Sequence, residues 1–178
     1  MKLLIVALLF LGSLSLNAGD SNGAIECLSA LPEKYRNGVL KVSADNANPD
    51  PTLWYVLARA GGNEAGFRNL TIASGEVTSD TPAIGFRQIF SSDKPIELSK
   101  VEVDSRDAFD IAQRYANANG KTIGSVSFVL NQKGSSAVPI WSVWCYGPSE
   151  NYFGKMQLLA TDGTVIENDA FTKSPAAR

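Results

Sequence analysis

The chain has 178 residues, of which 44% are hydrophobic and 19% are charged, and its formal net charge is −2. These values are typical of a globular protein with a sizeable core, and they lack the basic surplus that nucleic-acid binding requires. The sequence contains no histidine, which excludes histidine-based acid–base catalysis and most zinc sites. We expect no catalytic residue, no metal ion and no cofactor, although an enzyme that works without histidine stays open.

The first 18 residues have the pattern of a secretory signal peptide. Lys2 supplies a positive charge, and residues 3–16 are almost entirely apolar before the small residues that favour cleavage after Ala18. The apolar run is shorter than the roughly 20 residues of a membrane-spanning helix, so a membrane anchor is the less favoured alternative. We expect a secreted or periplasmic protein whose contact with a membrane ends at cleavage.

Residues 19–80 are expected to fold as a first unit. Asp20–Asn37 is a helical candidate that Pro32 interrupts, so one bent helix or two short helices both fit the pattern. The alternation of apolar and polar residues then predicts three or four strands. These strands would cover residues 39–44, 53–60, 68–73 and 76–79.

Residues 104–170 are expected to form a second unit, after a connecting segment at residues 81–103. The large apolar side chains of that segment indicate packing rather than a disordered linker. The second unit begins with an amphipathic helix that Asp104 or Ser105 can cap and that Asn119-Gly120 ends. Three strands follow, at residues 125–130, 140–146 and 154–160. A hairpin turn is expected at residues 162–163, and residues 171–178 form a tail that frays.

The two units share a pattern at a constant spacing. Gly66 corresponds to Gly154 and Gly75 to Gly163, with an offset of 88 residues in both cases (154−66 and 163−75). A fixed offset between chemically matching residues indicates an internal repeat. We therefore predict an α+β fold of two tandem repeats, each a helix packed on a three- to four-stranded antiparallel sheet.

Two motifs stand out in the second unit, P-I-W-S-V at residues 139–143 and L-A-T-D-G-T-V at residues 159–165, after an alanine-rich helix. In this order they resemble the PepSY domain, which would span residues 107–167, and residues 25–80 fit the same pattern more loosely. The resemblance implies an exported bacterial protein with a helix on an antiparallel sheet. PepSY domains occur in propeptides of secreted metallopeptidases and in cell-envelope proteins, and a protease-inhibiting or protein-binding role has been proposed for them.

The expected function is that of a non-enzymatic exported binding module, such as a peptidase-inhibitory or envelope protein-binding domain. Its partner would be an envelope or extracellular protein. A tandem pair of such units resembles, in architecture only, secreted inhibitors that bind an enzyme across a concave sheet. The alternatives are a small-ligand-binding protein and an enzyme that acts on an envelope polymer through paired carboxylates. A deep cleft with two carboxylates about 5–9.5 Å apart would favour the enzyme. A flat or concave sheet face with aromatic side chains would favour binding.

Aromatic side chains are the candidates for a binding surface. Trp54 and Trp141 occupy corresponding strand positions in the two units, which indicates core packing. Trp144 and Tyr146 lie on the opposite face of their strand, so they either pack against another part of the chain or form an exposed aromatic patch. The candidate binding residues are Tyr55, Trp144, Tyr146 and Tyr152.

Cys27 and Cys145 are the only two cysteines of the chain. Export to an oxidising compartment favours a disulfide between them, which would tie the two units together. Two separate buried thiols are the alternative, because free cysteine is among the most buried residue types. The sequence leaves both arrangements open.

Overall fold

The computed structural model describes residues 23–61, 66–84, 94–132, 134 and 137–175, so the expected signal peptide and part of the connecting segment lie outside the described residues. The helices are α1 (Ala24–Ser29), α2 (Glu33–Arg36), the 3₁₀ helix η2 (Leu98–Lys100) and α3 (Ser105–Ala118). The strands are β1 (Val39–Ala47), β2 (Trp54–Arg59), β3 (Phe67–Ala73), β4 (Glu76–Pro82), β5 (Ser125–Asn131), β6 (Ile140–Tyr146), β7 (Tyr152–Leu159) and β8 (Val165–Asn168). None of the helices in the described part is long and apolar enough to cross a membrane.

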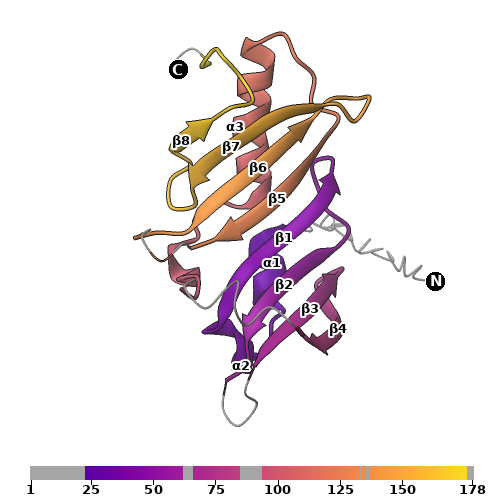
Figure 1. Cartoon of the computed structure of the whole chain (residues 1–178), viewed down its shortest axis with the longest axis vertical. Coiled ribbons are helices and arrows are strands. Elements are labelled where there is room, and N and C mark those ends of the chain that lie inside the picture. Colours follow the sequence, from indigo (N-terminus) through magenta and orange to yellow (C-terminus); the bar gives the residue numbers. More distant parts are fainter. Residues whose placement is uncertain (1–22, 62–65, 85–93, 133, 135–136, 176–178) are drawn as a thin grey trace, which may run out of the picture.

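The strands build one continuous antiparallel sheet in the order β4-β3-β2-β1-β5-β6-β7-β8 (Figure 1). Strands that follow each other in the chain are neighbours, except at the centre of the sheet. There β1 pairs with β5, with Val42 opposite Leu130 and Ala44 opposite Phe128. The first and second sets of four strands therefore meet edge to edge.

The prediction of two tandem helix-on-sheet repeats is wrong. A single eight-stranded sheet dominates the fold, and the described residues contain only three α-helices. Two separate sheets would have left β1 and β5 as edge strands with unpaired N–H and C=O groups. Pairing β1 with β5 gives the N–H and C=O groups of both edges hydrogen-bond partners. The alternation of side chains along a strand does not indicate which two edges will pair.

The glycines that the sequence alignment paired adopt matching backbone conformations. Gly66 and Gly154 have φ angles of 133° and 142°, and Gly75 and Gly163 both have a φ of 74°. Glycine adopts these angles at little steric cost, unlike other residues. The constant spacing thus records matching backbone conformations, in a turn for Gly75 and before β8 for Gly163, but not the way in which the sheet assembles.

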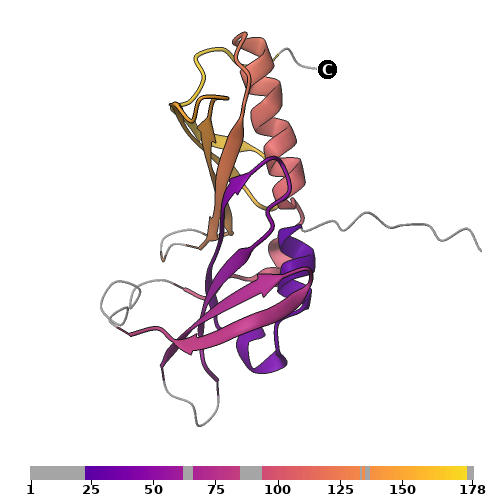
Figure 2. The ribbon, with the colours of Figure 1, turned by 90° about the vertical axis from the view of Figure 1, so that its right-hand side faces the viewer.

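The helices lie on one face of the sheet (Figure 2). Two short helices replace the first helical candidate, because Pro32 disfavours a helical conformation at Leu31 and becomes the N-cap of α2. The long helix α3 begins as predicted, with a capping box formed by Asp104 and Asp107. Local sequence signals therefore determine where each helix begins.

The hydrophobic core lies between the helices and the sheet, and three aromatic rings occupy its centre. The ring centroids of Trp54 and Phe128 are 6.2 Å apart, and those of Phe128 and Trp141 are 6.0 Å apart. The indole N–H of Trp141 donates a hydrogen bond of 2.8 Å to the carbonyl of Val103. The predicted core packing of both tryptophans is confirmed, since both are buried. Because the rings come from β2, β5 and β6, they join the two halves of the sheet.

The connecting segment and the C-terminal tail both have ordered contacts. Ile96 is buried, and its N–H donates to the carbonyl of Val39 at 2.7 Å. Phe171 is only 4% exposed, and its ring lies 6.3 Å from that of Phe153. The expectation that the tail frays from Phe171 onward is therefore wrong for its first residues, because an aromatic side chain anchors them to the core.

Candidate binding face

The side of the sheet opposite the helices carries the candidate binding residues, and no helix of the described part covers it (Figures 1 and 2). Residues directly opposite each other on neighbouring strands point to the same face of a sheet. The strand register therefore identifies the side chains of this surface, which we call the open face. Its residues include Lys41, Ser43, Tyr55, Thr71, Ser127, Val129, Ser142, Trp144, Tyr146, Tyr152, Lys155, Gln157 and Glu167.

All four aromatic residues predicted as a binding surface lie on the open face. Tyr55 and Tyr152 are 45% and 55% exposed, and Trp144 and Tyr146 are half-buried. The rings of Tyr146 and Tyr152 are 5.6 Å apart, so these two form a pair. Tyr55 is on β2, which is three strand spacings from β6, or about 14 Å. The open face therefore has an aromatic cluster on β6 and β7 and a separate tyrosine on β2.

Polar groups fill the surface between these aromatic side chains. The Gln157 amide donates a hydrogen bond of 3.0 Å to the hydroxyl of Ser142, which is buried. Lys155 forms an ion pair of 3.1 Å with Glu167 across β7 and β8. A sheet face that packs against another layer of the same chain is mainly apolar. Hydroxyl, amide and aromatic groups together are instead characteristic of binding surfaces.

A polar pocket of about 530 Å³ opens beside the end of β5. It lies between the end of β1, the start of β5 and the loop from β6 to β7. Its lining residues are Asn46, Asn48, Gly124, Ser125, Gly147, Pro148 and Glu150. Sequence analysis missed this pocket, because asparagine, glycine and proline in such stretches signal only turns.

Two further pockets among the described residues carry no pair of carboxylates either. One of about 230 Å³ lies between α1, the end of α2 and η2, and one of about 450 Å³ lies around residues 95–99. The first has no carboxylate in its lining, the second has Glu97 and the polar pocket has Glu150. Within the described residues, no cluster of three metal-binding side chains is present either.

Both cysteines are buried and free in the structure. Burial raises the pKa of Cys145 to about 12, and burial together with the nearby charge of Asp104 raises the pKa of Cys27 to about 12. Such thiols stay protonated at neutral pH and react slowly. This arrangement corresponds to the second alternative from the sequence, and the disulfide stays a prediction that thiol labelling can test.

No protein-family model, no curated protein and no solved structure matches this chain. The PepSY resemblance therefore rests on the motif residues alone.

Proposed function

We propose that the protein is an exported binding module, without catalytic activity, that binds a protein of the cell envelope or extracellular space through its open face. The observation that carries this proposal is a sheet face that no helix of the described residues covers, with Tyr55, Trp144, Tyr146 and Tyr152 upon it. The export signal at residues 1–18 and the PepSY resemblance support the location and the class of function.

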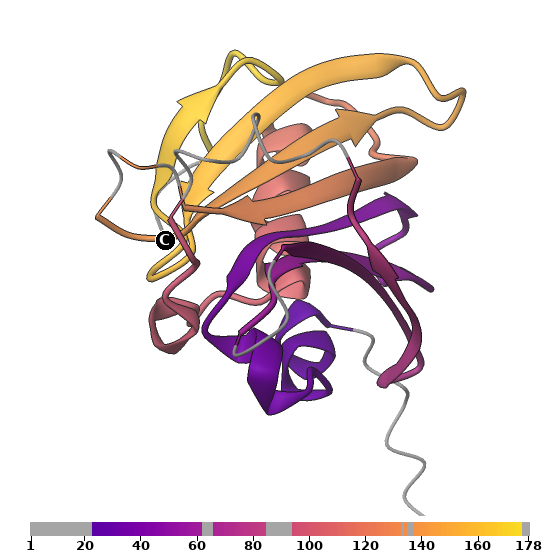
Figure 3. The same ribbon diagram turned by 60° about the horizontal axis from the view of Figure 1, so that its bottom comes forward.

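The dimensions of the open face suit a protein partner. Eight strands at a spacing of about 4.8 Å span about 34 Å, and six residues of strand span about 20 Å. The sheet is twisted (Figures 2 and 3), and the resulting area of roughly 700 Å² is close to the roughly 800 Å² that each partner buries in a standard protein–protein interface. A small ligand would instead need a concave site that encloses most of its surface.

The chemistry of the open face also suits a protein partner. Tyrosine and tryptophan offer large rigid contact areas and are enriched among the residues that dominate binding energy. The hydroxyl and amide groups of residues such as Ser43 and Gln157 can form hydrogen bonds around these anchors. The ion pair between Lys155 and Glu167, near the β8 edge, would belong to a polar rim.

Capture from the envelope fraction of the source organism tests the proposal. The baits are the wild-type protein, the double variant Tyr55→Ser/Tyr152→Ser and the control Ile25→Ser. Ile25 is 42% exposed on α1, on the helix-covered side, so it matches the exposed tyrosines in accessibility. We expect a protein that wild type and control capture equally and that the double variant captures at least about tenfold less.

Two results would contradict the proposal. One is equal capture of the same protein by the double variant, with its fold verified by circular dichroism. The other is hydrolytic activity of the purified protein on an envelope polymer that a single Asp or Glu substitution abolishes. The second result would favour the carboxylate-based enzyme instead.

A further inference from the structure

The polar pocket beside β5 adjoins the aromatic cluster of the open face. Ser125, in its lining, lies opposite Tyr146 on β6, and Tyr146 lies opposite Tyr152 on β7. A single cross-strand row therefore runs from the pocket through two tyrosine rings whose centroids are 5.6 Å apart. A partner that covers these rings would also reach the mouth of the pocket.

The polar side chains that line this pocket are unpaired among the described residues. In the described part of the chain, the side chains of Asn46, Asn48, Ser125 and Glu150 have no hydrogen bond or ion pair. The lining contains one carboxylate and no basic side chain. A carboxylate with no basic side chain in the same lining favours a positively charged occupant, and the amide and hydroxyl oxygens can accept hydrogen bonds from it.

The backbone holds two of these side chains in an uncommon conformation. Asn46 and Glu150 have φ angles of 54° and 59°, and they are two of the three non-glycine residues with positive φ in the described residues. Glycine would adopt this conformation more easily than glutamate, which rarely does so. The loop from β6 to β7 therefore presents a carboxylate at a position where a smaller residue would relieve strain.

We propose that this pocket receives an arginine side chain of the bound partner, with Glu150 as its counter-ion. The guanidinium group carries five donors for the oxygens of the pocket, and the apolar stem of the arginine can pass beside the ring of Tyr146, which lies opposite Ser125. The volume of about 530 Å³ is within the range of sites that hold a small ligand. The inference rests on the proposed function, because it names the residue by which the partner is anchored to the open face.

An NMR titration of the purified protein with N-acetyl-arginine N-methylamide tests this inference. The neutral probe is the citrulline analogue, which has nearly the same shape without the charge. We expect saturable shifts at the amides of Gly124, Ser125 and Gly147 with the arginine probe in the millimolar range. The variant Glu150→Gln should bind the arginine probe at least about tenfold more weakly, because it loses a charge-assisted pair. The control Glu102→Gln, which removes an exposed carboxylate outside the pocket lining, should bind as wild type does.

Three results would overturn the inference. They are equal binding of the citrulline probe, unchanged binding by Glu150→Gln, and no saturation below about 50 mM of the arginine probe. Partner capture separates this failure from a failure of the proposed function. A partner that depends on Tyr55 and Tyr152 but not on Glu150 would refute the arginine pocket and leave the binding face intact. Saturable arginine binding with capture that is independent of both tyrosines would refute the binding face instead.

Discussion

Trp141 combines the two kinds of interaction that hold the core together. Its ring is fully buried against Phe128, and its indole N–H satisfies the carbonyl of Val103 just before α3. Trp141→Ala should therefore lower the free energy of unfolding by about 3–5 kcal/mol, because it leaves a cavity and an unsatisfied carbonyl. Trp141→Phe keeps most of the volume and should cost less. Urea denaturation measures both variants, and a loss below about 1 kcal/mol for the alanine variant would show that the ring is not in the core.

Asp80 makes the stability depend on pH. Burial opposes its ionisation, but hydrogen bonds of 2.7 Å from Tyr35 and from Arg68 outweigh that effect and lower the pKa of the carboxyl below its usual value. A group whose pKa is lower in the folded state stabilises the fold above its unfolded pKa of about 3.9, and this stability is lost as the pH falls through the folded pKa. Wild type should therefore lose more stability below about pH 4 than Asp80→Asn does. If the melting temperatures of wild type and Asp80→Asn decreased by the same amount as the pH is lowered, this prediction would be contradicted.

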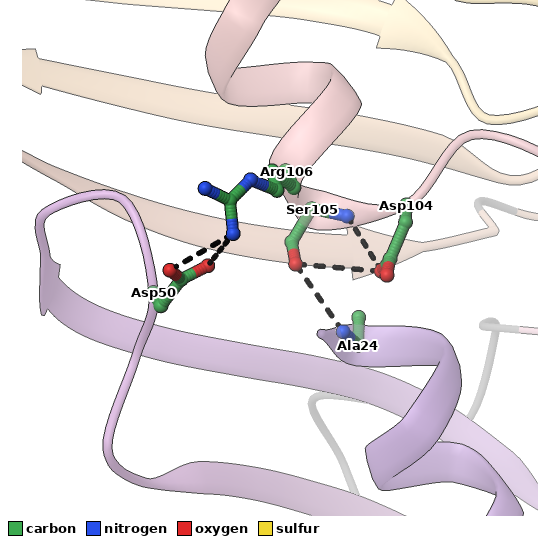
Figure 4. Close-up of polar contacts among 5 residues, drawn as sticks. All are labelled: Ala24, Asp50, Asp104, Ser105 and Arg106. Carbon is green, nitrogen blue, oxygen red and sulfur yellow. Dashed lines mark hydrogen bonds and ion pairs between the residues drawn. The ribbon is translucent and has the colours of Figure 1, made fainter. Parts of the chain in front are cut away.

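Helices α1 and α3 share one cap at their N-termini. Oδ1 of Asp104 accepts a hydrogen bond of 2.7 Å from the N–H of Ser105, and Oγ of Ser105 accepts one of 3.2 Å from the N–H of Ala24 (Figure 4). Oδ1 of Asp104 also accepts one of 3.1 Å from the N–H of Ile25. The first N–H groups of a helix have no partner within the helix, and a negative charge is favourable at that end. A single carboxylate thus connects helices whose first residues are 81 positions apart in sequence (105−24).

Asp104→Ala should destabilise the protein by about 2 kcal/mol, at the upper end of the range for N-cap residues, because two helices lose a partner. Asp104→Asn is the matched control, since asparagine caps nearly as well as aspartate. The neighbouring ion pair between Arg106 and Asp50, at 3.2 Å, is exposed and should contribute little (Figure 4). Thermal unfolding compares the variants. Equal losses for Asp104→Ala and Asp104→Asn would show that the shared hydrogen bonds contribute nothing.

Local signals in the sequence predicted most elements but not their assembly. The period-2 alternation located β2, β5 and β6 closely, and Asp104 located the start of α3, because these signals depend on neighbours in the chain. The pairing of β1 with β5 depends on two edges far apart in sequence, and alternation says only which face a side chain takes. The pocket was missed for a related reason, since three separate segments bring Asn46, Ser125 and Glu150 together.

At the scale of the whole molecule, the sheet has one face that packs against the helices and an opposite face that no helix of the described residues covers. The aromatic core that joins Trp54, Phe128 and Trp141 spans the junction of β1 and β5. We therefore expect one cooperative unfolding transition, with coincident curves from circular dichroism and from tryptophan fluorescence. Two separated transitions would show that each set of four strands is stable by itself.

The most direct test of the binding face is the affinity of the captured partner for single alanine variants on the two sides of the sheet. Tyr55→Ala and Trp144→Ala change the open face, and Ile25→Ala changes the helix-covered side at comparable exposure to Tyr55. We expect each open-face variant to weaken binding about tenfold or more and Ile25→Ala to weaken it less than about twofold, as measured by isothermal titration calorimetry. Full affinity in both open-face variants, with a loss at Ile25, would place the partner on the other side and contradict the account.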